Sequence, residues 1–180
     1  MKKQLIATIV GGIILFVWQF LSWSLLNIHA AEYQYTPNQG KIIEFLSQNL
    51  NADGGYMIPQ AAPGSTDEER QAVMENAMGK PWATINYHKS MDMSMSMNMI
   101  RGFAVDLVAA FLLVWLLLRF AHLDFKTAFM AALAVGFTGY LTIPYLNSVW
   151  FEASSIGSLI DTFAQWGLLG VWLGWWLNRP

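Results

Sequence analysis

Four long apolar runs, separated by polar segments, dominate the pattern of the chain. They cover residues 5–26, 102–118, 127–145 and 156–177. A helix needs about 20 mainly apolar residues to cross the hydrocarbon core of a bilayer, and each run is close to that length. We therefore predict an all-α membrane protein with four transmembrane helices.

The first run also has features of a secretory signal peptide. Lys2 and Lys3 give it a charged start, and residues 28–30 form a possible cleavage site. Its apolar stretch is longer than the roughly 7–15 residues of a signal peptide. We interpret residues 1–29 as an uncleaved anchor, the first transmembrane helix.

Residues 30–98 predict a small α+β insertion between the first and second transmembrane helices, and residues 99–180 hold the other three. The segment NQGKIIEFLSQNL has apolar residues at helical spacing, and YMIP and WATINYH have strand patterns. In STDEERQAVMENAMGKP, Thr66 and Glu69 predict the capping box of a second helix. A domain of this size buries little by itself, so we expect it to lean on the membrane helices or on a partner.

Lysine and arginine in the short segments predict the orientation, because basic residues stay on the cytoplasmic side. If the helices alternate, these residues share one side: Lys2, Lys3, Arg119, Lys126 and Arg179. The loop of residues 146–155 has no basic residue. We expect both termini in the cytoplasm, residues 30–98 in the periplasm, and the protein in the bacterial inner membrane.

Composition excludes several classes of function. The chain has no Cys, which excludes disulfides, thiolate metal sites and cysteine nucleophiles. A net charge of −2 offers no basic patch for nucleic acid. The sequence shows no nucleophile–His–acid grouping, phosphate loop or His-x-x-x-His pair, so we do not expect an enzyme.

A methionine-rich strip at residues 91–99 precedes the second apolar run. Its methionines alternate with polar residues at Met91, Met93, Met95, Met97 and Met99. In an extended chain these thioethers share one face; such sulfur ligands select Cu(I), and His88 and His29 could add imidazoles. The strip resembles the Met-rich segments of periplasmic copper carriers and copper-uptake channels. The alternative, which we favour, is an adaptable apolar face against the bilayer or a neighbouring protein.

Two carboxylates lie inside predicted membrane helices, where a charge is costly. Asp106 and Asp161 fall at the same predicted depth, with Arg101 about one turn above Asp106. The three residues predict one intramembrane polar cluster, either an ion or proton site or a structural clasp between the second and fourth helices. We favour the clasp, because this set makes no relay across the membrane.

The last apolar run carries a face of small residues at Gly167, Gly170 and Gly174. Such a face allows close approach of another helix. That helix could belong to this chain or to a partner, and we expect a partner's helix.

Four segments together resemble a loose group of uncharacterised bacterial four-helix inner-membrane proteins: GGIILFVWQFLSW, GGYMIP, MNMIRGFAVDLVAAFLLVWLL and IPYLNSVWF. The resemblance covers most of the chain and implies the architecture, but no activity or cofactor. Our leading hypothesis is an accessory or scaffold subunit of a larger membrane complex, in contact with the lipid bilayer and other subunits. The alternative is periplasmic capture and transfer, or uptake, of Cu(I) by the Met-rich strip.

Overall fold

The computed structural model describes residues 1–179 and divides the chain into two compact units. The membrane unit comprises residues 1–34 and 93–179, and the insert unit comprises residues 35–92. The insert unit is shorter than the predicted insertion of residues 30–98. At its first end the difference arises because residues 29–32 pack in the membrane unit. At its second end the next long helix already begins at Met95.

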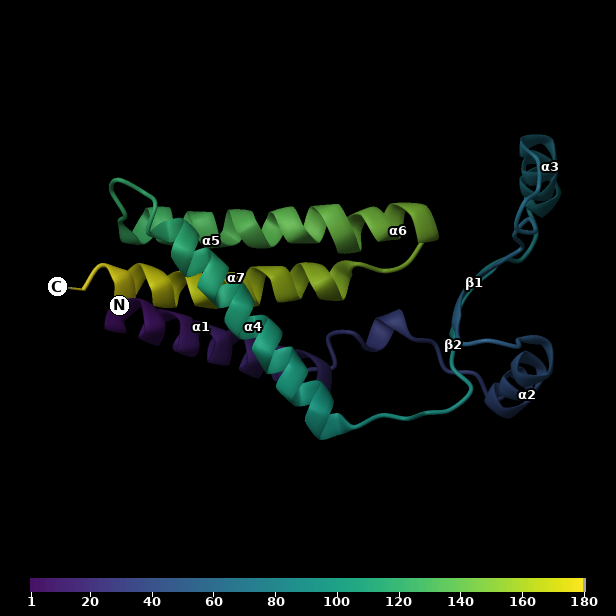
Figure 1. The fold of residues 1–180 in the computed structure, drawn as a ribbon, viewed down its shortest axis with the longest axis horizontal. Coiled ribbons are helices and arrows are strands. Elements are labelled where there is room, and N and C mark those ends of the chain that lie inside the picture. Colours follow the sequence, from purple (N-terminus) through teal and green to yellow (C-terminus); the bar gives the residue numbers. More distant parts are fainter. Residues whose placement is uncertain (180) are drawn as a thin grey trace. The chain divides into compact units, whose positions relative to one another are not determined.

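The membrane unit is built from four long helices (Figure 1). These are α1 (Lys2–Phe20), α4 (Met95–Leu117), α5 (Phe125–Tyr140) and α7 (Ile156–Leu177). A π-helical turn, Leu21–Leu25, extends α1, and a short 3₁₀ turn follows at Ala30–Glu32. A second π-helical turn, Leu141–Tyr145, joins α5 to α6 (Leu146–Phe151). Pro144 lies within this second turn.

Among residues 1–179, three helical segments are long and apolar enough to cross a membrane. They are Lys2–Ser24, Met95–Leu117 and Phe125–Phe151, with mean hydropathies of 2.1, 2.1 and 1.5. Helix α7 has a similar length but is not among these three segments. The protein is therefore a membrane protein by the length and composition of these helices.

Neighbouring helices of the membrane unit run antiparallel. Trp172 Nε1 donates to the carbonyl of Ala7 at 3.2 Å, and Trp176 Nε1 donates to the carbonyl of Lys3 at 2.8 Å. The end of α7 therefore lies beside the start of α1. In Figure 1, α1, α7 and α5 run side by side, and α4 crosses them obliquely.

Glycines set the closest helix contacts. A Cβ at Gly174 would lie 2.8 Å from Phe125 Cδ2, and one at Gly170 would lie 3.0 Å from Ala132 Cβ. At Gly167 the nearest atom, on Leu133, is 4.0 Å away. The glycine face of α7 is thus covered by α5 of the same chain. This corrects the expectation of a partner's helix there, because α5 already occupies the groove that the missing side chains leave.

The insert unit contains the elements predicted for it. They are α2 (Gln39–Asn49), β1 (Gly54–Ile58), α3 (Asp67–Ala77) and β2 (Ala83–Tyr87). The strands pair antiparallel, with Gly54 opposite Tyr87 and Ile58 opposite Ala83. The predicted capping box of α3 is present, since Thr66 Oγ1 accepts from Glu69 N and Glu69 Oε2 accepts from Thr66 N. Within this unit only Tyr87 is buried, so its core is very small.

The contact between α5 and α7 gives a stability prediction. We expect Gly174→Ala to destabilise the protein by about 1–3 kcal/mol, because the added methyl group meets Phe125 in a packed site. Gly167→Ala is the matched control: it makes the same change on the same helix, where the added methyl group would meet Leu133 only at the ordinary contact distance of 4.0 Å. Thermal unfolding in mild detergent measures both. Equal melting temperatures for the two variants would contradict the close contact at Gly174.

Candidate functional site

Asp161 on α7 is the centre of a polar cluster at one end of the membrane unit. Its Oδ1 accepts hydrogen bonds from Trp18 Nε1 at 3.0 Å and from Ser22 Oγ at 2.6 Å. Its Oδ2 lies 2.8 Å from His29 Nε2. Trp18 and Ser22 are four residues apart, so successive helical turns of the α1 segment present both donors on one face. The first apolar run therefore contains two polar partners for the half-buried carboxylate on α7.

The chain beyond α1 turns back and brings His29 to this carboxylate. Asn27 adopts a left-handed conformation with φ of 49°, which asparagine tolerates better than most residues. The His29 imidazole is 5% exposed and stacks on the Trp23 indole, with ring centroids 4.0 Å apart. Its Nδ1 lies 2.8 Å from Glu32 Oε1. We call Asp161, His29 and Glu32 the clasp.

Both ring nitrogens of His29 face carboxylate oxygens, which favours the imidazolium form because it can donate through both N–H groups. Burial acts to lower the pKa of His29, but the hydrogen bonds and charges of Asp161 and Glu32 outweigh it and raise the pKa above 6.5. The charged ring is thus held between two carboxylates. The clasp ties the segment that follows α1 to the start of α7.

Gly157 makes room for the clasp on α7. A Cβ at this position would lie 2.6 Å from both His29 Nδ1 and Glu32 Oε1. Any side chain would therefore push the imidazole away from α7. The one-turn spacing of Gly157 and Asp161 on one helix face makes both the space and the acceptor available to His29.

Asp106 on α4, the other carboxylate predicted to lie inside a membrane helix, has a different partner. Gln19 Nε2 donates to Asp106 Oδ1 at 2.8 Å. The other oxygen, Oδ2, is buried and has no hydrogen-bond partner among the described residues. Because Trp18 and Gln19 are adjacent on α1, Asp106 and Asp161 lie at the level of the same turn of α1, each bonded to this helix.

A pocket of about 420 Å³ adjoins the clasp between α1, α5 with its π-helical turn, and α7. Polar side chains line part of it, including Gln19, Ser158, Thr162 and Gln165, besides His29 and Asp161. Trp23, Trp166 and Pro144 supply apolar walls. The pocket brings the clasp next to a space that can hold water or a small polar molecule.

The predicted cluster of Arg101, Asp106 and Asp161 is only partly assembled. Both carboxylates bond to the α1 segment, but Arg101 is exposed and makes no salt bridge in the described part of the chain. The cations and donors come instead from the far end of the first apolar run. Polar residues inside that run were the available signal, since a buried amide or hydroxyl needs a partner.

The Met-rich strip is not one extended segment. Met95, Met97 and Met99 belong to the first turns of α4, while Met91 and Met93 precede it. A helix turns about 100° per residue, so alternating residues no longer share one face. His88 lies in the insert unit, and both ring nitrogens of His29 bond carboxylates. Copper binding by the strip stays a prediction, which a Cu(I) titration of the purified protein would test.

The clasp can hold a proton on His29, and it can hold residues 29–32 against α7. Ser22 donates to Asp161 and not to His29, so the imidazole does not activate this hydroxyl. His29 can bind or release a proton within the clasp. The deprotonated ring loses one of its two donors, and one carboxylate then faces a nitrogen lone pair. Deprotonation therefore weakens the clasp.

The raised pKa of His29 leads to a pH prediction. A histidine whose pKa is higher in the folded state contributes stability that is fully present below about pH 6.5 and is lost as the pH rises through the folded-state pKa. Nuclear magnetic resonance of the histidine ring in detergent should give a pKa above 6.5 for His29, with His29→Gln identifying its signal. Asp161→Asn should lower that pKa. An unchanged pKa in Asp161→Asn would contradict the clasp.

No family model, curated protein or solved structure matches the chain. The function proposed below therefore rests on the residues and geometry of this chain.

Proposed function

We propose that the protein is an accessory subunit of a bacterial inner-membrane complex, anchored by four transmembrane helices and docked to a partner protein through its insert unit. The observation that carries this proposal is the uncovered apolar face of α2. A small unit with a buried core of one side chain has apolar surface left to bury. The membrane helices hold this surface at the bilayer, where other subunits are available.

The packing of α7 supports a fourth membrane span. Its contacts with α1 extend from Asp161, bonded to Trp18, to Trp176, bonded to Lys3. These residues lie at opposite ends of α1, which is itself long and apolar enough to span. A helix that follows a spanning helix over this length lies in the same bilayer. The alternating directions of the long helices are those of successive spans.

The proposed orientation has both termini in the cytoplasm and the insert unit in the periplasm. The chain has no Cys, so a single introduced thiol reports one position. We expect Ser65→Cys to react with a membrane-impermeant maleimide in cells whose outer membrane has been opened. His122→Cys should react only after the inner membrane is permeabilised. Labelling of His122→Cys in intact spheroplasts would contradict the proposed orientation and indicate the opposite one.

The face of α2 is suited to a protein partner. Ile42 and Phe45 lie one turn apart on this helix, with Ile43 at the edge of the same apolar arc, and the three side chains are 46%, 64% and 61% exposed. Lys41, Glu44 and Gln48 lie on the other side. An amphipathic helix that presents its apolar side is one of the recurring elements of protein recognition. Burial of an Ile or Phe side chain contributes about 1.5–3 kcal/mol.

The clasp has a place in this function. Residues 29–32 connect the first membrane helix to the insert unit, and Asp161 holds them against α7. The connection therefore starts from a fixed point of the bundle. Since His29 is part of that fixed point, the attachment is firmest at mildly acidic pH.

Co-purification tests the docking. We expect Ile43→Glu with Phe45→Glu to reduce the yield of co-purifying subunits in mild detergent by more than about tenfold, which corresponds to about 1.4 kcal/mol. Ser47→Glu with Gln48→Glu is the matched control, because it adds the same charge to the polar side of α2. Quantitative mass spectrometry of the affinity-purified protein gives the yields. Equal recovery with both double variants would place the docking surface elsewhere, and no partner with the unaltered chain would reject the accessory role.

A further inference from the structure

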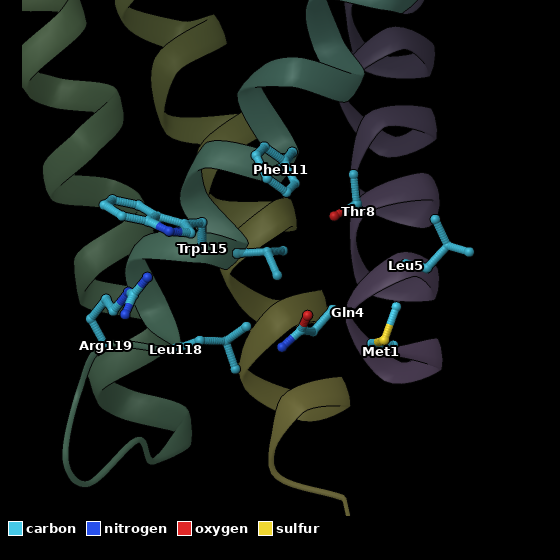
Figure 2. Close-up of a pocket in the computed structure, with 9 residues that line it drawn as sticks. Met1, Gln4, Leu5, Thr8, Phe111, Trp115, Leu118 and Arg119 are labelled. Atoms are coloured by element: carbon cyan, nitrogen blue, oxygen red, sulfur yellow. The ribbon is translucent and has the colours of Figure 1, made fainter.

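A groove of about 540 Å³ lies between α1 and α4, near the start of α1 and the end of α4. The helices are in close contact at Gly12, where a Cβ would lie 2.7 Å from Leu107 Cδ2. Toward Met1 and Arg119 the space between them opens (Figure 2). In Figure 2, Phe111, Trp115 and Leu118 line the α4 side, Thr8 and Leu5 belong to α1, and Arg119 lies at the level of Gln4.

We propose that this groove binds one anionic phospholipid, with its headgroup at Arg119 and an acyl chain along Leu5 and Phe111. Its walls are apolar apart from Gln4, Thr8 and Arg119, and none of the described residues that line it is acidic. A long apolar space with one cationic end fits an amphiphile with one anionic end. Because α1 and α4 are both long and apolar enough to span the membrane, the amphiphile at hand is the lipid of the bilayer.

The cation of the groove is held in place. The Arg119 guanidinium lies over the Trp115 ring, 5.0 Å from its centroid, which orients it by a cation–π interaction. Arg119 follows the last residue of α4, Leu117, so it lies at the depth where a helix leaves the hydrocarbon core. A basic residue between membrane helices at this depth is suited to a lipid phosphate.

The two polar residues that α1 contributes to the groove, Gln4 and Thr8, lack side-chain partners in the described chain. Neither the Gln4 amide nor the Thr8 hydroxyl makes a side-chain hydrogen bond within residues 1–179. The amide N–H groups of Gln4 and the hydroxyl of Thr8 can therefore donate to a molecule in the groove. The phosphate and ester oxygens of a phospholipid are acceptors at this depth, and a partner's apolar helix is a poorer match for both groups.

Native mass spectrometry of the protein from nanodiscs tests the site. In equimolar phosphatidylglycerol and phosphatidylcholine we expect the unaltered chain to retain phosphatidylglycerol preferentially, with one bound molecule as the main species. Arg119→Gln should reduce this retention by about fivefold. Arg179→Gln is the matched control: Arg179 stacks on Trp175 with its guanidinium carbon 3.4 Å from the ring centroid, and it lies outside the groove. We expect the control to retain the lipid.

A second variant separates the groove from a general effect of charge. Leu5→Trp fills the groove and leaves Arg119 intact, so it should also lose the lipid while its melting temperature in detergent stays close to that of the unaltered chain. Equal lipid retention in Arg119→Gln and the unaltered chain would overturn the proposal. An equal loss of lipid in Arg179→Gln would also overturn it, because the effect would then come from charge alone. Cross-linking of this groove to a protein would overturn it as well.

Discussion

The membrane unit depends on the hydrogen bonds that it supplies to the carboxylate of Asp161, because a carboxylate largely removed from water needs partners from the protein. Trp18, Ser22 and His29 all come from α1 and the segment that follows it. Removal of one partner from a buried charged group costs about 1.5–3 kcal/mol or more. The three bonds therefore fix how far α7 can slide along α1, and they fix where the chain leaves α1. Apolar side chains alone would define the register of two lipid-embedded helices much less strictly, because lipid tails compete with them for the same contacts.

The shapes of the helix surfaces place the other helices. Gly170 and Gly174 let α5 approach α7, and Gly12 lets α4 approach α1. Gly11 lies against both α7 and α4, since a Cβ there would lie 2.8 Å from Leu169 Cδ1 and 3.2 Å from Ala110 Cβ. Different contacts join the helices at the two ends of the bundle. At the His29 end the helices are joined by side-chain hydrogen bonds, and at the Lys3 end by glycine contacts and by Trp172 and Trp176. At the Arg119 groove, neither a side-chain hydrogen bond nor a close glycine contact joins α1 to α4 in the described structure.

Much of the fold can be read from the sequence because it follows from local rules. The apolar runs predict the long helices, and Thr66 with Glu69 predicts the start of α3, since capping needs only residues three apart. The clasp could not be found in this way. Its members, Asp161 and His29, are distant in sequence and meet only after the π-helical turn and Asn27 redirect the chain. Proximity along α4 suggested Arg101 as the cation, but an exposed arginine can remain in water and His29 cannot. For the Met-rich strip, the two-residue period suggested an extended segment, while the helix that follows extends back to Met95.

The position of the clasp explains why so small an insert can be useful in a membrane protein. A unit whose own core is a single buried tyrosine gains little stability from burial, so its attachment points determine how it is presented. One attachment is held by an ion pair on α7, and the other continues into α4, which begins two residues after Met93. Both ends are thus tied to helices that pack on α1. A partner that binds α2 consequently binds a segment tethered at both ends, which lowers the entropy lost on binding compared with a free tail.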